Sequence, residues 1–421
     1  MHTLLPVPFS LPVRLAAATA EAEPVSAQPE FCPNRSCRFH SRRLAADHQW
    51  FVLFGTFHTR ARGPIQRFRC RACGKTCSTQ TFSIHYWTHY TNDLGWLLGY
   101  LGSCSGLRQS ARMAGVTHRV LQNRCRRLAR NALALMDCAL SRLRLSEHLA
   151  MDGFESFTRN QFHPNNITHL CGSSSQFVYA AVHTLFRRKG SMTASQRRHR
   201  ALIDSVWKPS RSIRTDCTEL LSDLAPAIDA ACTPGGRPFF LDTDLHPAYP
   251  KAIASVPLLA RRLAEGSLIH RRTSSRKPRT THNPLFAVNY VDRQMRSTMA
   301  EYVRETIRQG REVNSQMERM AIFTALHNFA TPHRIDDRAR PFPSDTHASI
   351  AAIAGDSLDW HLGRMLTHRH VYSHTTRRFA WIRRIWLHEY DNPPAVRLKK
   401  GVVVERRVAL TADEIPRYLR V

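Results

Sequence analysis

Residues 238–250, PFFLDTDLHPAYP, place a buried-strand pattern directly before two carboxylates, Asp242 and Asp244. Ligands in open α/β sheets bind beyond the carboxyl ends of strands, so acids at such a position can hold a metal ion. Asp152 ends a second apolar run, at residues 149–152, and Asp292 lies in a segment with helical spacing. Three acids from separate elements, Asp152, Asp244 and Asp292, predict a site for two divalent cations.

The composition points to a polyanionic partner. The 421 residues include 61 Lys and Arg against 32 Asp and Glu, a formal net charge of +29. A polyanion such as DNA is the leading interpretation, while RNA and a membrane surface remain open alternatives. A hydrophobic content of 43% supports buried cores, and the length predicts two to four modules.

The amino terminus and the hydropathy pattern bear on location. No run approaches the roughly 20 apolar residues that span a bilayer, so we expect no membrane partner and a cytoplasmic, nucleoid-associated protein. Residues 1–30 are interpreted as a mobile extension. A cleaved signal peptide is less favoured, because the region before Leu4 carries no Lys or Arg.

Residues 31–90 carry two cysteine pairs. Five of the eleven cysteines cluster between Cys32 and Cys77, which favours a metal site over a disulfide framework. Gly74 allows the tight turn that follows a zinc knuckle. The expected ligands of one structural Zn²⁺ in a zinc ribbon are Cys32, Cys37, Cys70 and Cys73. The alternative is a set of unrelated buried cysteines; His40 and Cys77 are spare candidates, and Cys77 is expected to be a packed thiol.

Residues 91–145 have the pattern of a helix-turn-helix. Leu107 and Ala111 mark one helical face, Gly115 supplies the turn, and Thr117 can cap a second helix. The side chains expected to project from that second helix toward DNA are Arg119, Gln122, Asn123, Arg126 and Arg127. An ordinary helical hairpin with a solvated basic face is the alternative.

Residues 146–334 predict a mixed sheet flanked by helices, so the fold class is mixed α/β. Strands are expected at residues 149–157, 174–183, 238–244 and 267–270, with helices at 193–207, 217–231, 247–265 and 289–309. A basic loop spans residues 271–282. Residues 335–421 form a carboxyl-terminal extension of unknown role, in which Trp360, Trp381 and Trp386 indicate some folded content.

Each proposed acid has an alternative. Glu155 can be the metal ligand in place of Asp152. Asp242 shares a strand face with Asp244, so one of these two can bind the metal while the other only holds it in position. Glu318 is the rival for the third acid. Asp292 is preferred because Arg293 and Arg296 adjoin it and can neutralise phosphate.

Taken together, these motifs carry a family resemblance. The segments CRACGKTCSTQTFS, DGFESF, TDLHPAYPKAI, NPLFAVNYVDRQMR and RETIRQGRE, together with the helix-turn-helix, occur in this order. The set resembles bacterial insertion-sequence transposases of the DDE/DDD class with an amino-terminal zinc ribbon, over roughly residues 31–333. The resemblance implies a ribonuclease-H-like catalytic domain, Mg²⁺ or Mn²⁺, and recognition of terminal inverted repeats. It supports Asp152 and Asp244 and places the third acid at Asp292, where many relatives carry Glu.

The expected function is therefore that of a DNA transposase. Its partners are double-stranded DNA, at element ends and target, and further copies of the chain on that DNA. The cations expected to hold phosphates are Arg271, Arg272 and Arg276, in a loop that resembles the basic segment before the last catalytic helix. The rival of another class is a DNA-binding regulator, including a transposase remnant that no longer cuts. An RNA-directed nuclease would need aromatic side chains exposed on a sheet.

Overall fold

Two hydrophobic clusters organise the part of the chain that the computed structural model describes, residues 28–34, 36–60, 62–88, 94–233, 235–303, 306–334, 336, 345–353, 355–369, 379–399 and 402–406. One cluster lies within residues 31–82, and the other runs from Ile84 to Tyr390. Most of the expected extension at residues 1–30 falls outside the described residues. None of the described helices has the length and apolar character needed to cross a membrane.

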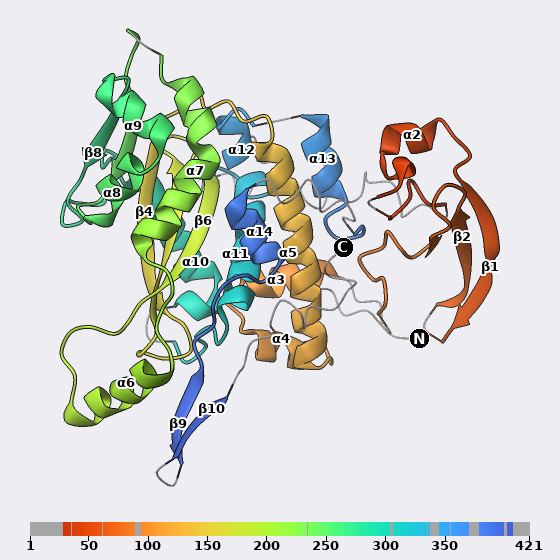
Figure 1. Ribbon diagram of the computed structural model, residues 1–421, viewed down its shortest axis with the longest axis horizontal. Helices are drawn as coiled ribbons and strands as arrows, with labels where there is room; N and C mark the ends of the chain where they lie inside the picture. The colour runs from red at the N-terminus through yellow and green to blue at the C-terminus, as the bar shows by residue number, and fades with distance from the viewer. Residues whose placement is uncertain are drawn as a thin grey trace.

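The amino-terminal cluster surrounds a small antiparallel sheet in the order β1-β2-β3. Its elements are η1 (Arg38–His40), α2 (Arg42–Ala46), β1 (Phe51–Thr59), β2 (Gly63–Cys70) and β3 (Thr76–Ser78). Trp50, Phe68 and Phe82 are buried in its core. Figure 1 shows this sheet at one end of the molecule, beside the helical body.

Three helices follow, α3 (Leu94–Gly102), α4 (Leu107–Met113) and α5 (His118–Leu140). The turn between α4 and α5 has the expected chemistry: Gly115 has φ +63°, and the Thr117 side chain accepts a hydrogen bond from the backbone of Val120. The second half of α5 is buried on all sides, and α5 packs against α4, α11, α13 and α14. Residues 94–145 therefore share one hydrophobic core with the rest of the body, whereas the sequence favoured a helix-turn-helix domain of its own.

The central sheet has five strands in the order β6-β5-β4-β7-β8. They are β4 (Leu149–Phe157), β5 (Pro164–Gly172), β6 (Val178–Leu185), β7 (Phe239–Thr243) and β8 (Leu268–Arg272). Short turns make β4, β5 and β6 antiparallel, whereas β7 and β8 run parallel to β4 after helical crossovers, as parallel pairing requires. Strand β5 was not predicted.

Helices cover both faces of this sheet. The helices of this part of the chain are α6 (Ala194–Val206), α7 (Ile213–Ala231), α8 (Ala248–Ala254), α9 (Pro257–Ala264), α10 (Phe286–Thr298), η2 (Ala300–Tyr302) and α11 (Val313–Phe329), of which α6 projects away from the sheet in Figure 1. On β5, Thr168 contacts Cys217 of α7, whereas the next residue, His169, contacts Asp292 of α10. Successive side chains of a strand point to opposite faces, so α7 and α10 lie on opposite sides of the sheet.

Two predicted helices differ in extent. The helix expected at residues 247–265 is divided into α8 and α9, because Pro257 begins a new helix at its first position. The helix expected at residues 289–309 ends at Thr298, since Met299 takes an extended backbone conformation.

The carboxyl-terminal part is integrated into the body. It contains α12 (His347–Ile350), α13 (Asp356–Gly363), α14 (Ala380–Trp386), β9 (Ala395–Lys399) and β10 (Val402–Arg406). Trp381 and Trp386 are each 1% exposed, and α14 packs against α5, α7, α11 and β6. The expectation of folded content near these tryptophans is confirmed. Figure 1 shows β9 and β10 as a hairpin that projects from the body.

Candidate functional site

Asp152 and Asp244 lie side by side at the centre of the large sheet. Strand β4 pairs in parallel with β7, so that Met151 is opposite Thr243, and each aspartate is the next residue along its strand. The buried runs before them hold this register, because a shift by one residue would turn the apolar side chains out of the core. The two carboxylates therefore lie level with each other, at the edge where β7 ends.

Asp292 approaches from the helix that covers this face. It lies on α10, which packs against β4 and β5, and its Oδ1 is 3.1 Å from Nε2 of the buried His169. His169 is opposite Asp152 in the antiparallel pair, so the two side chains share a face of the sheet. Burial lowers the pKa of His169, but its contact with Asp292 outweighs that effect and raises the pKa above its usual value.

The three acids interact electrostatically. Burial raises the pKa of Asp152 to about 7, and the negative charges of Asp244 and Asp292 add to the rise. The Asp152 carboxylate accepts a hydrogen bond from the backbone of Gly153 at 2.7 Å, and Asp244 accepts one from the backbone of His246. Among the described residues, neither Asp152 nor Asp244 forms an ion pair. A bound cation would offset the repulsion between these carboxylates and favour their charged forms.

The donor chemistry of this site fits Mg²⁺ or Mn²⁺, which prefer carboxylate oxygens. The three aspartates do not all bring their oxygens within 4.8 Å of one another; within the described ranges, only the four cysteines of the amino-terminal sheet meet that limit. The arrangement is thus wider than the donor set of a single ion.

Asp242 has a different role from Asp244. It is 1% exposed, and its two oxygens accept hydrogen bonds from Nε and Nη2 of Arg271 at 2.7 and 2.8 Å. The guanidinium of Arg271 also lies over the ring of Phe240, 4.0 Å from its centroid. Arg271 therefore neutralises a buried acid, so the phosphate-binding role predicted for it conflicts with this pairing.

The two other rival acids lie elsewhere. Glu155 is exposed and three positions from Asp152, so the alternation of the strand turns it to the opposite face. Glu318 is 1% exposed on α11, with Oε1 2.5 Å from His388 and 3.3 Å from Arg130. Burial raises the pKa of Glu318, but its interactions with His388, Arg130 and Arg126 outweigh that effect and lower the pKa. Glu318 is committed to a buried ion cluster.

The cysteines of the amino-terminal sheet form a compact cluster. Cys32 Sγ lies 3.5 Å from Cys73 Sγ, Cys37 Sγ lies 3.7 Å from Cys70 Sγ, and all four sulfurs fall within 4.8 Å of one another. A tetrahedron with Zn–S bonds of about 2.3 Å has sulfur separations of about 3.8 Å. The four predicted ligands thus come together in a group that can hold a metal such as zinc.

The surroundings of the cysteines shift the pKa values of their thiols. Burial raises the pKa of Cys32, whereas hydrogen bonds, chiefly from Asn34, offset burial and bring the pKa of Cys73 to about 7. Burial also raises the pKa of Cys77 to about 12, and its side chain packs in the hydrophobic cluster, as expected for a structural thiol. His40 Nδ1 contacts the carbonyl of Cys32 at 2.8 Å and so supports the cluster from outside.

The predicted recognition helix does not present all five expected side chains to solvent. Arg127 is buried and donates to the carbonyl of Ile84 at 2.6 Å, and Arg126 lies 3.7 Å from Glu318 with a side chain only 12% exposed. These two side chains face other parts of the protein, whereas the sequence led us to expect them to face DNA. Gln122 donates to Ser315 at 3.0 Å, Asn123 accepts from Arg127, and Arg119 is exposed.

Other basic side chains remain accessible. Arg272 and Arg276 are exposed after β8, where Arg272 donates to the carbonyl of Leu245. On β1, Phe54 is 38% exposed, and the guanidinium groups of Arg67 and Arg69 lie 5.1 and 4.9 Å from its ring centroid. This aromatic and cationic face was not predicted; the phenylalanines at positions 51, 54 and 57 were its signal.

No model of a protein family matches the chain, and a search of curated proteins found no significant match. The arguments for function therefore rest on the residues and their geometry.

Proposed function

We propose that this protein is a DNA transposase of the DDE/DDD class, which cleaves element ends and transfers the strands with divalent cations. The observation that carries the proposal is the convergence of Asp152, Asp244 and Asp292, where burial, together with the charges of the other two acids, raises the pKa of Asp152 to about 7. Acids held together without a compensating cation are a mark of functional sites, because their repulsion costs stability.

The topology of the central sheet supports a ribonuclease-H-like catalytic domain. Three antiparallel strands, β6, β5 and β4, are followed across the sheet by two strands parallel to β4. The first acid lies on β4, the second directly after β7, and the third on the helix after β8. These are the positions that the resemblance to DDE/DDD transposases assigns to the catalytic acids.

The roles of the residues follow from their places. Asp152, Asp244 and Asp292 would hold Mg²⁺ or Mn²⁺, which would supply charge stabilisation for in-line displacement at a phosphodiester. His169 holds Asp292 in position through its 3.1 Å contact. Asp242 and Arg271 neutralise each other beside the site, so Asp242 adds no uncompensated charge to it.

The charge of the chain supports duplex DNA as the partner. A net charge of +29 favours a polyanion, and the exposed Arg272 and Arg276 lie in the loop between β8 and α10, the element that carries Asp292. The cysteine cluster would hold Zn²⁺ as a structural ion in a zinc ribbon that helps to bind element ends. Pairing of two ends would bring two copies of the chain together on DNA.

The rival function is a regulator or transposase remnant that binds DNA ends without cutting. The two are separated by incubating the purified protein with labelled duplex DNA from the flanks of its gene, with Mg²⁺ and with a chelator. A transposase cuts at a fixed position only with Mg²⁺, whereas a regulator binds the same fragment and leaves it intact. Specific binding without cleavage in Mg²⁺ or Mn²⁺ contradicts the proposal.

A further inference from the structure

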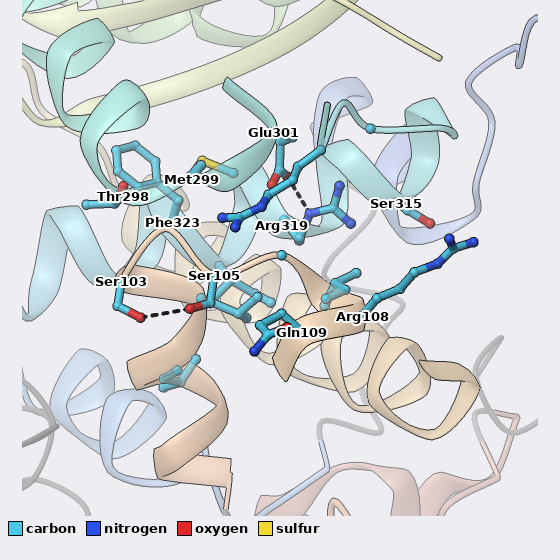
Figure 2. Close-up of a pocket in the computed structure, with 18 of the residues that line it drawn as sticks. Ser103, Ser105, Arg108, Gln109, Thr298, Met299, Glu301, Ser315, Arg319 and Phe323 are labelled. Atoms are coloured by element: carbon cyan, nitrogen blue, oxygen red, sulfur yellow. Dashed lines mark hydrogen bonds and ion pairs between the residues drawn. The ribbon is translucent and has the colours of Figure 1, made fainter. Parts of the chain in front are cut away.

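A large cavity lies on the far side of α10 from the acids. It has a volume of about 1070 Å³ and is enclosed by α3, α4, the first turns of α5, the end of α10, residues 306–312 and α11. Gln294 and Thr298 of α10 line it, and these side chains point away from Asp292 because they lie about 200° and 240° further around the helix. Figure 2 shows side chains from four of these segments turned toward a common space.

Four arginines surround the cavity without an acidic partner among the described residues. They are Arg108 and Arg112 of α4, and Arg308 and Arg311 of the segment before α11. All four are exposed, and the contacts of Arg112 and Arg308 are hydrogen bonds to neutral oxygens of Gln109 and Cys104. Four unpaired cations held around one space attract an anion.

The same positive charges act on His118, which also lines the cavity. Burial lowers the pKa of His118, and the charges of Arg108, Arg319 and Arg311 lower it further. The two acids of the cavity offset the rim charge only in part, because Glu312 is bonded to neutral groups and keeps its negative charge. Glu301 is paired with Arg319, and Glu312 accepts hydrogen bonds from Ser315 and Gln122.

The inner wall of the cavity is apolar. Leu98, Met299, Ile322 and Phe323 line it, and Phe323 is partly buried with its ring next to that of His327. In Figure 2, Phe323 and Met299 lie above Ser103 and Ser105 of the turn before α4, and the Arg108 side chain extends to the right, away from Phe323. An apolar, aromatic wall facing a cationic rim has the chemistry of a nucleotide site, since bases stack on aromatic rings while arginines hold phosphates.

We propose that this cavity binds an unpaired stretch of a DNA strand, with a base against Phe323 and its phosphates at Arg108, Arg112 and Arg311. This inference rests on the proposed function and adds to it a site for single-stranded DNA. The volume is that of a large ligand pocket, typically about 300–1,000 Å³, which accommodates one or two nucleotides. In a duplex the bases are paired and stacked inside the helix, so they are not free to stack on Phe323. The first turns of the predicted recognition helix thus form a wall of this site, and Gln122 faces it.

The test compares single-stranded and duplex DNA on the full-length, zinc-loaded protein. A short labelled oligonucleotide and its duplex are titrated by fluorescence anisotropy over a series of salt concentrations. For the double variant Arg108→Ala, Arg112→Ala, the slope of log K against log salt for the single strand falls by about 0.7 for each lost contact. Phe323→Leu keeps apolar volume but removes the ring, and it weakens single-strand binding about fivefold or more.

The control removes the same charge elsewhere. Arg197→Ala with Arg198→Ala, two exposed arginines on α6, leaves single-strand binding unchanged. The proposal is overturned if the Arg108 and Arg112 variant binds the single strand as the wild type does, or loses single-strand and duplex affinity equally. It is also overturned if a free nucleoside monophosphate competes as well as the oligonucleotide.

This result is separable from the proposed function. Mg²⁺-dependent cleavage by the wild type with no effect of the cavity variants refutes the cavity site alone. Single-strand binding that depends on the cavity, without cleavage of any duplex end, refutes the transposase activity alone.

Discussion

Replacing Glu318 by Gln tests the interpretation of the buried ion cluster. The carboxylate lies 2.5 Å from His388, 3.3 Å from Arg130 and 3.7 Å from Arg126, and it is 1% exposed. Removing one partner of a buried pair costs about 3–5 kcal/mol. Arg130 keeps hydrogen bonds to two carbonyls, those of Arg126 and Trp386. We therefore expect the free energy of unfolding to fall by about 3 kcal/mol, the lower end of that range.

The assay is urea unfolding at neutral pH followed by far-ultraviolet circular dichroism. The matched control is Glu265→Gln on the other side of the molecule, where the side chain is 41% exposed beside Arg262 and the change costs less than about 1 kcal/mol. If Glu318→Gln is as stable as the control, the cluster does not hold α5, α11 and the segment after α14 together. DNA cleavage by the folded fraction of Glu318→Gln is expected to persist.

Three further outcomes follow from the structure. Replacing Cys70 and Cys73 by Ser abolishes stoichiometric zinc in metal analysis, whereas Cys77→Ser retains it; zinc retained in the double variant contradicts the four-cysteine site. Burial and the charge of Arg159 lower the pKa of His163 to about 4. The folded state therefore loses stability relative to the unfolded state as the pH falls from 6.5 toward 4. Between neutral pH and pH 5, the free energy of unfolding of the wild type falls by about 2 kcal/mol more than that of His163→Gln. Arg272→Ala and Arg276→Ala each lower the salt slope of duplex binding by about 0.9, whereas Arg127→Ala lowers the melting temperature and leaves that slope unchanged; equal slopes in all variants contradict the assignment.

The strands that carry Asp152 and Asp244 could be predicted because each is an apolar run that ends on an acid. Strand β4 occupies residues 149–157, as expected, and β7 begins within the predicted strand. The turn at Gly115 and the cap at Thr117 could also be predicted, because both depend on residues that are neighbours in the sequence.

Strand β5 could not be recognised from apolar alternation, because its buried side chains are largely polar. Asn165 donates to Thr158, Thr168 donates to Asn166, and His169 meets Asp292. Asn166 lies on β5 itself, whereas Thr158 lies in the turn after β4 and Asp292 on α10. A polar strand of this kind is stabilised by hydrogen bonds that only the tertiary structure supplies.

The environment of α5 was misjudged for a related reason. Its basic first half suggested a DNA-facing helix, yet Arg127 and Arg130 find partners at Ile84 and Trp386, which are distant in sequence. The apolar second half, residues 132–140, was the available signal, since a helix that is apolar all round is a core helix.

The most direct test of the central claim is Mg²⁺-dependent cleavage of a labelled DNA end by Asp152→Asn, Asp244→Asn and Asp292→Asn, with DNA binding measured on the same preparations. Each variant keeps the shape of the side chain but removes a charged ligand, so we expect binding to persist and cleavage to be lost. Asp204→Asn, an acid on α6 outside the site, retains cleavage. Normal cleavage by Asp292→Asn, with Asp152→Asn and Asp244→Asn inactive, would contradict the three-acid site.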